Sequence, residues 1–594
     1  MKIELSKWRM TFVKVIFLII CFILLWRLSV LQIARGDYYS DLSLRQAGAG
    51  NIDTERGNIY FQNKNGELVP AAINKKNFLL AVNPKLIEDY SNNPTSDSTA
   101  EAPKKNTLYE KLSQIVQLDY DNFIKKIAKK DDPFEILVQH LDKETALKIT
   151  SFQNEYKGLI LAPEKWRFYP ANNLGSHLLG FVGYDGAQLK GRYGLENFYD
   201  SYLAGEKTVN KKPFLTSLLD LGQRVFANYE ASGSSIILTV EPVLQGVLES
   251  HLEKIFQKYD GLKAGGVIID PRNGKILAMA VKPDFNPNEY WKVKDVSIFN
   301  NPLVENIFEV GSVFKPLTLG AAIDQSAIAP ETEYYDKGYV VFNNKMIENY
   351  DGKARGKVDM QTVLNKSLNT GAVFAMEALG KEKFKSYIIN YGLAEKTGID
   401  LPGEVRGKTD NLNSMRDIEF ATASFGQGIA VSPIEFVAAF SALVNGGNVI
   451  QPYLVEKIIP SEDLSAKEPS SIFELKEFGA VKRKVLKNET SETINRMLTE
   501  VVDEALLEGG VKMEHYAVAA KTGTAQKIKS DAAGYSDDYL HTFIGYFPSF
   551  DPRFLIFLFL ERPVGARYAA YTLTPPFMDI VKFIINYYEL PPDR

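Results

Sequence analysis

Strand-like segments lie at both ends of the region from Gly233 to the C-terminus, and this placement limits the fold more than any other feature. Near its start, GGVIIDPRNGKILAMAV has two apolar runs around Pro-Arg-Asn-Gly, the pattern of a β-hairpin. Near its end, HYAVAAKTGTAQ, TFIGYFPS and FLIFLFLERP read as three more strands. The last is apolar on successive residues, as in a strand covered on both faces. Because residues 300–445 between them read as helical, we predict an α+β domain whose sheet joins distant chain segments. The final stretch, PPFMDIVKFIINYYEL, reads as a helix that packs on this sheet.

The N-terminus contains an apolar segment long enough to cross a bilayer as a helix, Thr11 to Leu31. Lys14 and Arg27 interrupt it, but each lies near one end and can extend its charge to the interface. Basic residues in the preceding tail favour a cytoplasmic N-terminus. We therefore predict a cytoplasmic tail over residues 1–10 and a single membrane anchor over 11–31. The alternative is a cleaved signal peptide, although no small-x-small cleavage site follows.

Composition excludes several classes of protein. The chain of 594 residues is 45% hydrophobic and 24% charged, as expected for two or three globular domains. The net charge of -4 gives no indication of nucleic-acid binding. The single cysteine, Cys21, lies inside the apolar segment, so no disulfide or cysteine-based site is expected after it. We predict no metal site and no cofactor, because the histidines are scattered without ligand spacing. The histidines are His140, His177, His251, His515 and His541.

Residues 42–231 alternate short strands, helical stretches and polar loops. KNTLYEKLSQIVQL and YDNFIKKIAKK have helical spacing, whereas the segment from Ser91 to Asn106 has the composition of a loop. No catalytic constellation occurs in this region. We interpret it as a spacer or docking module.

A serine and a lysine lie three residues apart in FEVGSVFKPLTLG, residues 308–320. Ser312 is the only serine in the sequence with a lysine at i+3. If a helix begins here, Ser312 and Lys315 share one of its faces, and Pro316 suits a position near its start. A serine becomes a good nucleophile when a neighbour takes its proton, and a lysine can do so once burial or another cation lowers its pKa. Such pairs also occur without function, so the interpretation depends on other motifs.

Two later motifs supply that support. NKSLNTGAVFAMEALG contains Ser367 and Asn369 before a helical stretch, and AVAAKTGTAQ follows at the end of a strand signal. The candidate residues of the second motif are Lys521, Thr522, Gly523 and Thr524. In this order the three motifs match the serine, lysine and Lys-Thr-Gly set of penicillin-recognising enzymes. The chain resembles the class B penicillin-binding proteins, monofunctional DD-transpeptidases that cross-link peptidoglycan. Further segments carry the resemblance along nearly the whole chain: ERGNIY, WRFYP, LLGFVG, GRYGLENFYDSYLAG, IIDPRNGKILAMA, TGIDLPGE and SFGQGIAVSP.

The resemblance implies an architecture. After the transmembrane helix, residues 42–231 would form an elongated pedestal or dimerisation domain. Residues 232–594 would form the penicillin-binding transpeptidase domain, with a five-stranded antiparallel sheet flanked by helices.

The resemblance also implies a mechanism. Ser312 would attack the carbonyl between the last two D-alanines of a stem peptide, with Lys315 as the base that takes its proton. Ser367 would relay the proton to the leaving amine, and Lys521 would shape the local field. Asn369 would hydrogen-bond the substrate amide.

The Lys-Thr-Gly motif would supply the remaining contacts. Thr522 and Thr524 would hold the terminal carboxylate of the substrate, with Gly523 between them. The backbone N–H groups of Ser312 and Thr524 would form the oxyanion hole, whose single donors each contribute about 10²–10³ in rate. β-Lactams would inhibit the enzyme by acylating the same serine.

A second Lys-Thr-Gly, in EKTGID, competes for the catalytic assignment. It begins at Lys396, runs into the loop LPGE and lacks the alternating strand that precedes Lys521. We therefore predict that Lys521 is catalytic and Lys396 structural. Ser91 of SNN also matches Ser-x-Asn, which we interpret as chance, and Ser367 without the other motifs would read as a helix N-cap.

Alternatives remain within and outside the family. A β-lactamase or β-lactam sensor shares the serine chemistry, but no loop with a deacylating glutamate is recognisable and the predicted cytoplasmic tail is short. A non-catalytic scaffold is disfavoured by the intact Ser312, Lys315 and Lys521. Ser-x-Asn followed by K-T-G-T-A-Q favours the septal division branch, and the elongation branch is the alternative. Either branch implies a SEDA-type glycosyltransferase as a partner in the bacterial cytoplasmic membrane, with the catalytic domain outside it. The division branch implies other divisome membrane proteins as well.

Overall fold

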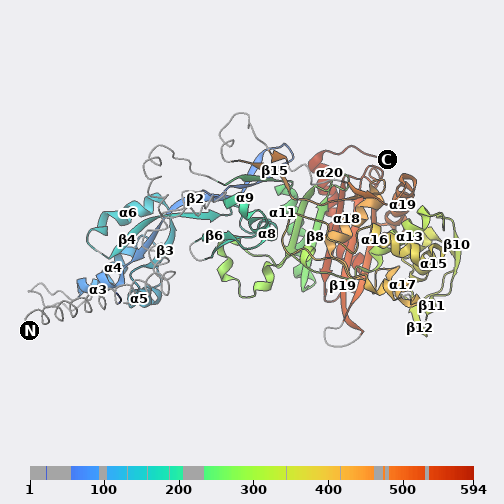
Figure 1. Cartoon of the computed structure of the whole chain (residues 1–594), viewed down its shortest axis with the longest axis horizontal. Helices are drawn as coiled ribbons and strands as arrows, with labels where there is room; N and C mark the ends of the chain where they lie inside the picture. Colours follow the sequence, from blue (N-terminus) through green and yellow to red (C-terminus); the bar gives the residue numbers. More distant parts are fainter. Residues whose placement is uncertain are drawn as a thin grey trace, which may run out of the picture.

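The five strands expected from the two ends of the C-terminal region form one sheet in the computed structural model (Figure 1). Its order is β18-β19-β20-β8-β9, and every neighbouring pair is antiparallel. The predicted α+β fold and its five-stranded antiparallel sheet are thus confirmed. The strands are β8 (Lys263–Ile269), β9 (Ile276–Lys282), β18 (Ala519–Ile528), β19 (Tyr535–Phe547) and β20 (Phe554–Glu561). The strand expected over HYAVAAKTGTAQ begins only at Ala519 and continues through the Lys-Thr-Gly motif to Ile528.

The structure describes Phe22 and residues 55–91, 104–129, 132–156, 158–185, 188–204, 233–342, 344–414, 416–460, 473–474, 481–528 and 534–594. The predicted tail (1–10) and, apart from Phe22, the predicted anchor (11–31) lie outside this part of the chain. Within it, no helix combines the length and the apolar character needed to cross a membrane.

Helices cover both faces of the five-stranded sheet. On one face lie α11 (Pro242–Lys258) and the predicted C-terminal helix, α20 (Ala569–Tyr588), where the rings of Phe543 and Phe577 are 4.6 Å apart. On the other face lies α18 (Pro433–Val444), of which every residue is buried. All of β20 is buried too, as predicted for a strand covered on both faces.

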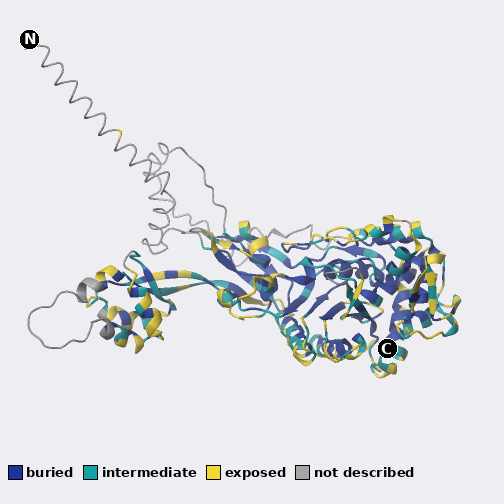
Figure 2. Ribbon diagram, turned by 90° about the horizontal axis from the view of Figure 1, so that it is seen from below, coloured by how far each residue is buried: buried dark blue, intermediate teal, exposed yellow. Residues whose placement is uncertain are grey.

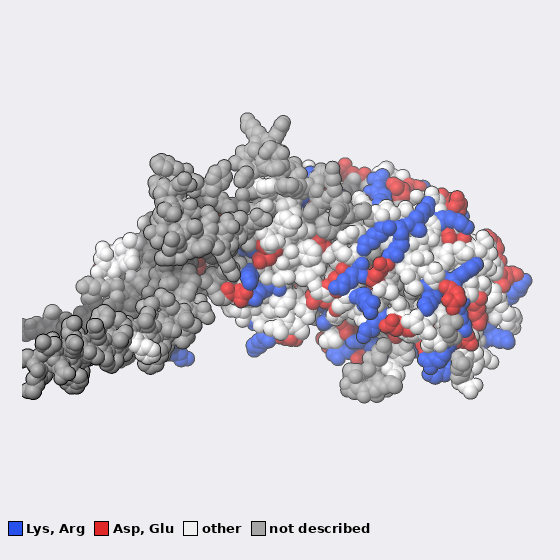
Figure 3. Space-filling model, in the orientation of Figure 1, with Lys and Arg blue, Asp and Glu red and all other residues white. Residues whose placement is uncertain are grey.

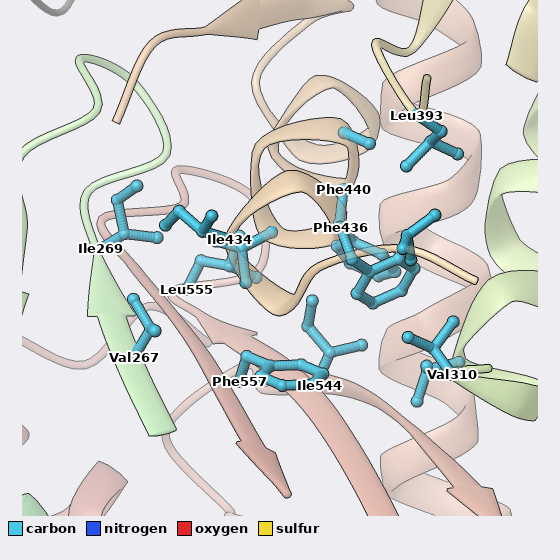
Figure 4. Close-up of a cluster of buried hydrophobic side chains, with 14 of the residues drawn as sticks. Val267, Ile269, Val310, Leu393, Ile434, Phe436, Phe440, Ile544, Leu555 and Phe557 are labelled. Carbon is cyan, nitrogen blue, oxygen red and sulfur yellow. The ribbon is translucent and has the colours of Figure 1, made fainter. Parts of the chain in front are cut away.

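The core between α18 and the sheet is built from large side chains that alternate along the strands (Figure 4). Phe436 of α18 packs against Phe557 of β20, with ring centroids 6.0 Å apart. Val310, next to the Ser-x-x-Lys motif, belongs to the same cluster. The segment that carries the Ser-x-x-Lys motif is therefore anchored directly in the core of the domain.

The region 300–445, expected to be helical, also contains two small two-stranded sheets. In these sheets β10 (Glu333–Asp336) pairs with β13 (Gly356–Asp359), and β11 (Tyr339–Phe342) pairs with β12 (Lys345–Glu348). Four-residue strands give too short an alternating pattern to be separated from helix by sequence. The helices of this region and its continuation are α12 (Pro302–Glu305), α13 (Lys315–Asp324), α14 (Met360–Asn365), α15 (Asn369–Leu379), α16 (Lys381–Asn390), α17 (Asp417–Ala423) and α19 (Asn488–Glu500).

The pedestal extends away from this domain along the 15-residue strand β2 (Leu68–Val82) (Figure 1). At its far end, helices pack on β2, β3 (Glu135–Leu141) and β4 (Leu159–Phe168) around a separate small core. Figure 2 shows buried residues filling the domain of the five-stranded sheet, whereas exposed residues are prominent on the pedestal helices. The pedestal helices are α3 (Pro84–Ser91), α4 (Lys104–Ser113), α5 (Tyr120–Ile127), α6 (Lys143–Gln153), α7 (Ser176–Leu179), α8 (Gly194–Phe198) and α9 (Asp200–Ala204).

A second sheet joins the pedestal to the catalytic region. Strand β1 (Ile59–Gln62) pairs antiparallel with β2 and parallel with β7 (Ser235–Leu238). Strand β7 in turn pairs with β15 (Val455–Ile459), far along the chain. Seven strands belong to this sheet, in the order β16-β15-β7-β1-β2-β3 with β4 paired to β2. The remaining strands are β5 (Val182–Asp185), β6 (Gln188–Gly191), β14 (Asn448–Ile450), β16 (Phe473–Glu474) and β17 (Val481–Lys484).

Buried ionic groups reinforce this joint. Glu196 accepts hydrogen bonds from Arg56 at 2.7 Å and from Arg167 at 2.6 Å, and its side chain is fully buried. Arg56 also donates to Asp200, and Tyr169 donates to Glu196. Burial alone would raise the pKa of Glu196, but the two guanidinium groups lower it. The motifs ERGNIY, WRFYP and GRYGLENFYD therefore meet in one buried network. On the face of the molecule seen in Figure 3, acidic and basic side chains are interspersed where residues are coloured.

Candidate active site

Ser312 lies in a tight 3₁₀ turn, η5 (Gly311–Phe314), that leads directly into α13. Gly311 adopts a φ of +67°, which residues with a side chain rarely adopt, and this conformation makes the turn possible. Ser312 is half-buried, so its hydroxyl is placed between the core and the surface. Pro316 lies in the first turn of α13, as the sequence predicted.

Neighbouring segments hold this turn from both sides. The backbone N–H of Gly311 donates to the carbonyl of Gly426 at 3.1 Å. The hydroxyl of Thr542 on β19 donates to the carbonyl of Val310 at 2.8 Å. The carboxylate of Glu309 accepts from the N–H of Gly428 at 2.9 Å. The SFGQG segment and the central part of the sheet thus fix the backbone that carries Ser312.

Lys315 is fully buried, and its Nζ reaches the second motif. It donates to the carbonyl oxygen of Ser367 at 2.5 Å and to the Ser367 hydroxyl at 3.2 Å. Burial, and after it the charge of Lys521, lowers the pKa of Lys315 well below the ordinary lysine value. A neutral lysine amine can accept a proton, and Lys315 begins the helix that directly follows the turn of Ser312.

Ser367 is the point where the three motifs meet. Its hydroxyl also accepts from Nζ of Lys521 at 3.0 Å. Ser367 has a φ of +53°, a conformation that costs energy for a residue with a side chain. It precedes Leu368, the N-cap of α15, so its hydroxyl is directed toward the lysines and does not cap the helix.

Lys521 lies on the edge strand β18 and is almost completely buried. Its Nζ donates to the carbonyl of Thr522 at 3.1 Å in addition to Ser367. Burial lowers the pKa of Lys521 to about 7. Its charge is therefore sensitive to pH near neutrality.

Gly523 allows β18 to approach η5, the turn that carries the proposed nucleophile Ser312 and is called the nucleophile turn below. A Cβ at this position would lie 2.3 Å from Oγ1 of Thr542 and 2.8 Å from the carbonyl oxygen of Val310. No real side chain fits at these distances, so the glycine of Lys-Thr-Gly is required by packing.

Lys521 and Gly523 lie on the buried face of β18. Thr522 and Thr524 alternate with them along the strand, lie on its opposite face and are both half-buried. The hydroxyl of Thr524 accepts from the backbone N–H of Ala569, the first residue of α20, at 3.1 Å. Its own O–H remains able to donate. The half-buried threonines thus place hydroxyl donors along the edge strand.

Asn369 is held by residues that the sequence did not reveal. Its backbone N–H donates to the side-chain oxygen of Asn349 at 2.9 Å, and its side chain donates to the carbonyl of Glu348 at 2.8 Å. Asn349 donates in turn to the buried carboxylate of Asp336, which also accepts from the hydroxyl of Thr370. Asp336 ends β10 and Asn349 directly follows β12, in a region that was expected to be helical, and no motif marked them.

The structure thus brings together Lys315, Ser367 and Lys521 through hydrogen bonds, with Ser312 one turn before Lys315. Lys396, the competing lysine, is exposed on a loop, whereas its neighbour Thr397 is buried and donates to Glu404. Within the described residues there is no group of three metal-ligating side chains.

Two family models match the chain. The family model of the penicillin-binding protein transpeptidase domain matches residues 264–582. The model of the penicillin-binding protein dimerisation domain matches residues 51–213.

Curated relatives match most of the chain. The stage V sporulation protein D of Bacillus subtilis is 32% identical over 582 residues, which cover 96% of this chain and 84% of that protein. The probable peptidoglycan D,D-transpeptidase PenA of Neisseria meningitidis is 26% identical over 490 residues, covering 82% of this chain and 79% of that protein.

Solved structures share the fold. Penicillin-binding protein 3 of Mycobacterium tuberculosis, complexed with aztreonam, has a TM-score of 0.62 at 24% identity and covers 73% of this chain and 92% of that chain. Penicillin-binding protein 2X of Streptococcus thermophilus has a TM-score of 0.67 at 18% identity and covers 89% of this chain and 79% of that chain.

Proposed function

Because the chain belongs to the class B penicillin-binding proteins, the serine-type peptidoglycan D,D-transpeptidases of extracytoplasmic cell-wall synthesis, we propose that it cross-links stem peptides through an acyl-enzyme on Ser312. One observation carries this assignment. The hydroxyl of Ser367 accepts hydrogen bonds from both Lys315 and Lys521, so the three motifs share one buried polar centre.

In the first half-reaction, the oxygen of Ser312 attacks the carbonyl carbon between the last two D-alanines of the donor stem peptide. Neutral Lys315 accepts the hydroxyl proton, since its burial disfavours the charged form. The proton passes through the hydroxyl of Ser367 to the nitrogen of the leaving group. The C–N bond breaks, and D-alanine leaves with that proton.

In the second half-reaction, an amine of a neighbouring stem peptide attacks the ester carbonyl on Ser312. The amine loses a proton to Lys315, the C–O bond to Ser312 breaks, and the serine oxygen regains a proton. The product is a new amide between two stem peptides. Lys521 contributes a positive charge near this centre while it is protonated.

The edge strand β18 is the proposed binding surface for the donor peptide. Thr522 and Thr524 would hold its terminal carboxylate beside Gly523, and Asn369 would hydrogen-bond its amide. The backbone N–H groups of Ser312 and Thr524 would form the oxyanion hole. A β-lactam would enter the same site and acylate Ser312, as the aztreonam and ampicillin complexes of the tuberculosis homologue suggest by analogy.

We propose the septal division branch for this enzyme. Relatives named FtsI or an FtsI homolog support this branch at 25–26% identity. The proposed anchor at residues 11–31 would hold it in the bacterial cytoplasmic membrane, beside a SEDA-type glycosyltransferase and other divisome proteins, with the pedestal over residues 42–231 for docking. The name of the 32% identical relative favours wall synthesis during sporulation as a second candidate. Wall synthesis during cell elongation is the third candidate.

Fluorescent-penicillin labelling of the full-length protein, followed by a chase, tests the chemistry. We expect label that depends on Ser312, is lost in Ser312→Ala and persists through the chase. Label that disappears rapidly would indicate a β-lactamase, and folded protein that takes no label would indicate a scaffold. Depletion of the protein in growing and in sporulating cells separates the branches. Loss of a septal enzyme should turn growing cells into filaments, whereas loss of a sporulation enzyme should affect only sporulating cells.

A further inference from the structure

A cation without an ionic partner lies in the connection between β20 and α20. Arg567 is exposed, and none of the ion pairs found among the described residues includes it. Arg562, at the start of the same connection, is exposed as well. The two arginines differ in how their segments are attached to the active site.

The segment of Arg567 is fastened to the central sheet by a buried histidine. Nε2 of His541 lies 3.2 Å from the carbonyl oxygen of Arg567, and Nδ1 lies 2.8 Å from the hydroxyl of Thr572. A carbonyl only accepts, so Nε2 carries the hydrogen and Nδ1 accepts from Thr572. Burial lowers the pKa of His541 to about 4, so this arrangement persists at neutral pH.

The same segment is attached to the edge strand. The backbone N–H of Ala569, two residues after Arg567, donates to the hydroxyl of Thr524. His541 and Thr524 are direct partners in the β18–β19 register, so their side chains lie on the same face of the sheet. An anion that accepts a hydrogen bond from Thr524 is therefore bound on the face where the Arg567 segment lies.

Aromatic contacts also link the segment of Arg567 to the residues next to the Ser-x-Asn motif. The guanidinium carbon of Arg567 is 5.4 Å from the centre of the Tyr568 ring, and that ring is 5.9 Å from the ring of Tyr350. Tyr350 follows Asn349, which holds the backbone of Asn369. Arg567 thus lies in a segment that contacts both the strand of the Lys-Thr-Gly motif and the residues that hold the Ser-x-Asn motif.

We propose that Arg567 is a specificity-determining residue that recognises the terminal carboxylate of the donor stem peptide, beside the hydroxyl of Thr524. The proposal rests on the proposed function. A guanidinium group offers two parallel N–H donors that match a carboxylate, whereas threonine hydroxyls offer single neutral donors. Arg567 would make the site select an ionised carboxylate over a neutral ester or amide of the same shape.

The test compares two probes on the full-length protein: a fluorescent penicillin with its free carboxylate, and the methyl ester of the same penicillin. We expect R567Q to slow acylation by the free acid about 10- to 100-fold, the effect typical of losing a charge-assisted hydrogen bond, and to change acylation by the ester less than about threefold. The rate of acylation of R567K by the free acid should lie between those of the wild type and R567Q, because lysine keeps the positive charge but lacks the two parallel N–H donors. R562Q is the matched control and should leave both rates unchanged.

Equal slowing with both probes, or no slowing with either, would overturn the proposal. Thermal unfolding of each variant shows whether the segment is intact, and R567K serves as the test if R567Q does not fold. Failure of the proposed function is recognised separately, because the wild-type protein would then take neither probe on Ser312.

Discussion

Nζ of Lys315 and Nζ of Lys521 donate to the same oxygen, the hydroxyl of Ser367, at 3.2 Å and 3.0 Å. Two ammonium groups this close repel each other, and both are removed from water. The pair therefore favours a state in which at least one lysine is neutral. Lys315 is the one whose pKa is lowered by both burial and its partner's charge, and so it is the better base.

The first prediction concerns pH. Acylation needs neutral Lys315, so its rate should rise as pH increases through the lowered pKa of that residue. Lys521 loses its charge above its pKa of about 7, so the rate should fall on the alkaline side. Stopped-flow measurement of penicillin acylation should give a bell-shaped profile. In Lys521→Arg, which stays charged, the alkaline fall should disappear. An unchanged alkaline fall would mean that another group causes it.

The second prediction separates the two Lys-Thr-Gly motifs. Lys521→Ala removes a donor to Ser367 and should slow penicillin acylation about 10²–10³-fold. Lys396→Ala, on an exposed loop, should retain most of the wild-type rate. Gel-based labelling over time measures both. The reverse result would reassign the catalytic motif.

The third prediction tests the packing of β18 on the nucleophile turn. In Gly523→Ala the new methyl group would collide with Thr542 and with the carbonyl of Val310, and the strand would have to move. We expect acylation to slow about 10²-fold, because displacements of about 1 Å have this effect. Gly246→Ala on α11 is the control, since the nearest atom to its Cβ lies 3.8 Å away. Near-normal rates in Gly523→Ala would show that the strand adjusts without cost.

The fourth prediction concerns the pedestal joint. Glu196→Gln leaves the guanidinium group of Arg167 buried without its counter-charge and leaves Arg56 paired with Asp200 alone. Breaking a buried ion pair in this way destabilises by about 3–5 kcal/mol. Chemical denaturation monitored by fluorescence should show the change. Glu144→Gln removes an exposed ion pair with Lys148 and should change stability by less than about 1 kcal/mol. Similar stabilities for the two variants would contradict a structural role for the buried network.

The sequence predicted the strands and the motif residues because each has a local signal. Apolar runs revealed β8, β9 and β20, and the unique Ser-x-x-Lys spacing revealed Ser312. That Lys315 and Lys521 meet at Ser367 could be expected only from the family resemblance. The two lysines lie 52 and 154 positions from Ser367, and contacts over such separations produce no local sequence pattern.

Groups that support the site without a motif were not predictable. Asp336, the last residue of a four-residue strand, and Asn349, the residue after another, act through tertiary hydrogen bonds, and periodicity carries little information in such short elements. Thr542 lies in a recognised strand, yet its hydroxyl matters because of Val310, 232 positions away. The seven-stranded sheet was missed for the same reason, since its strands come from residues far apart in the chain.

That sheet has a mechanical consequence. Strands β1 and β2 continue the pedestal's backbone hydrogen bonds into β7 and β15, and the side chains of β1 and β7 belong to the same core as the nucleophile turn. A flexible tether would absorb a push applied at the far tip of the molecule. We expect this joint instead to pass such a force on to the domain that carries Ser312, because β1 is hydrogen-bonded to β7 and both are buried in the core of that domain.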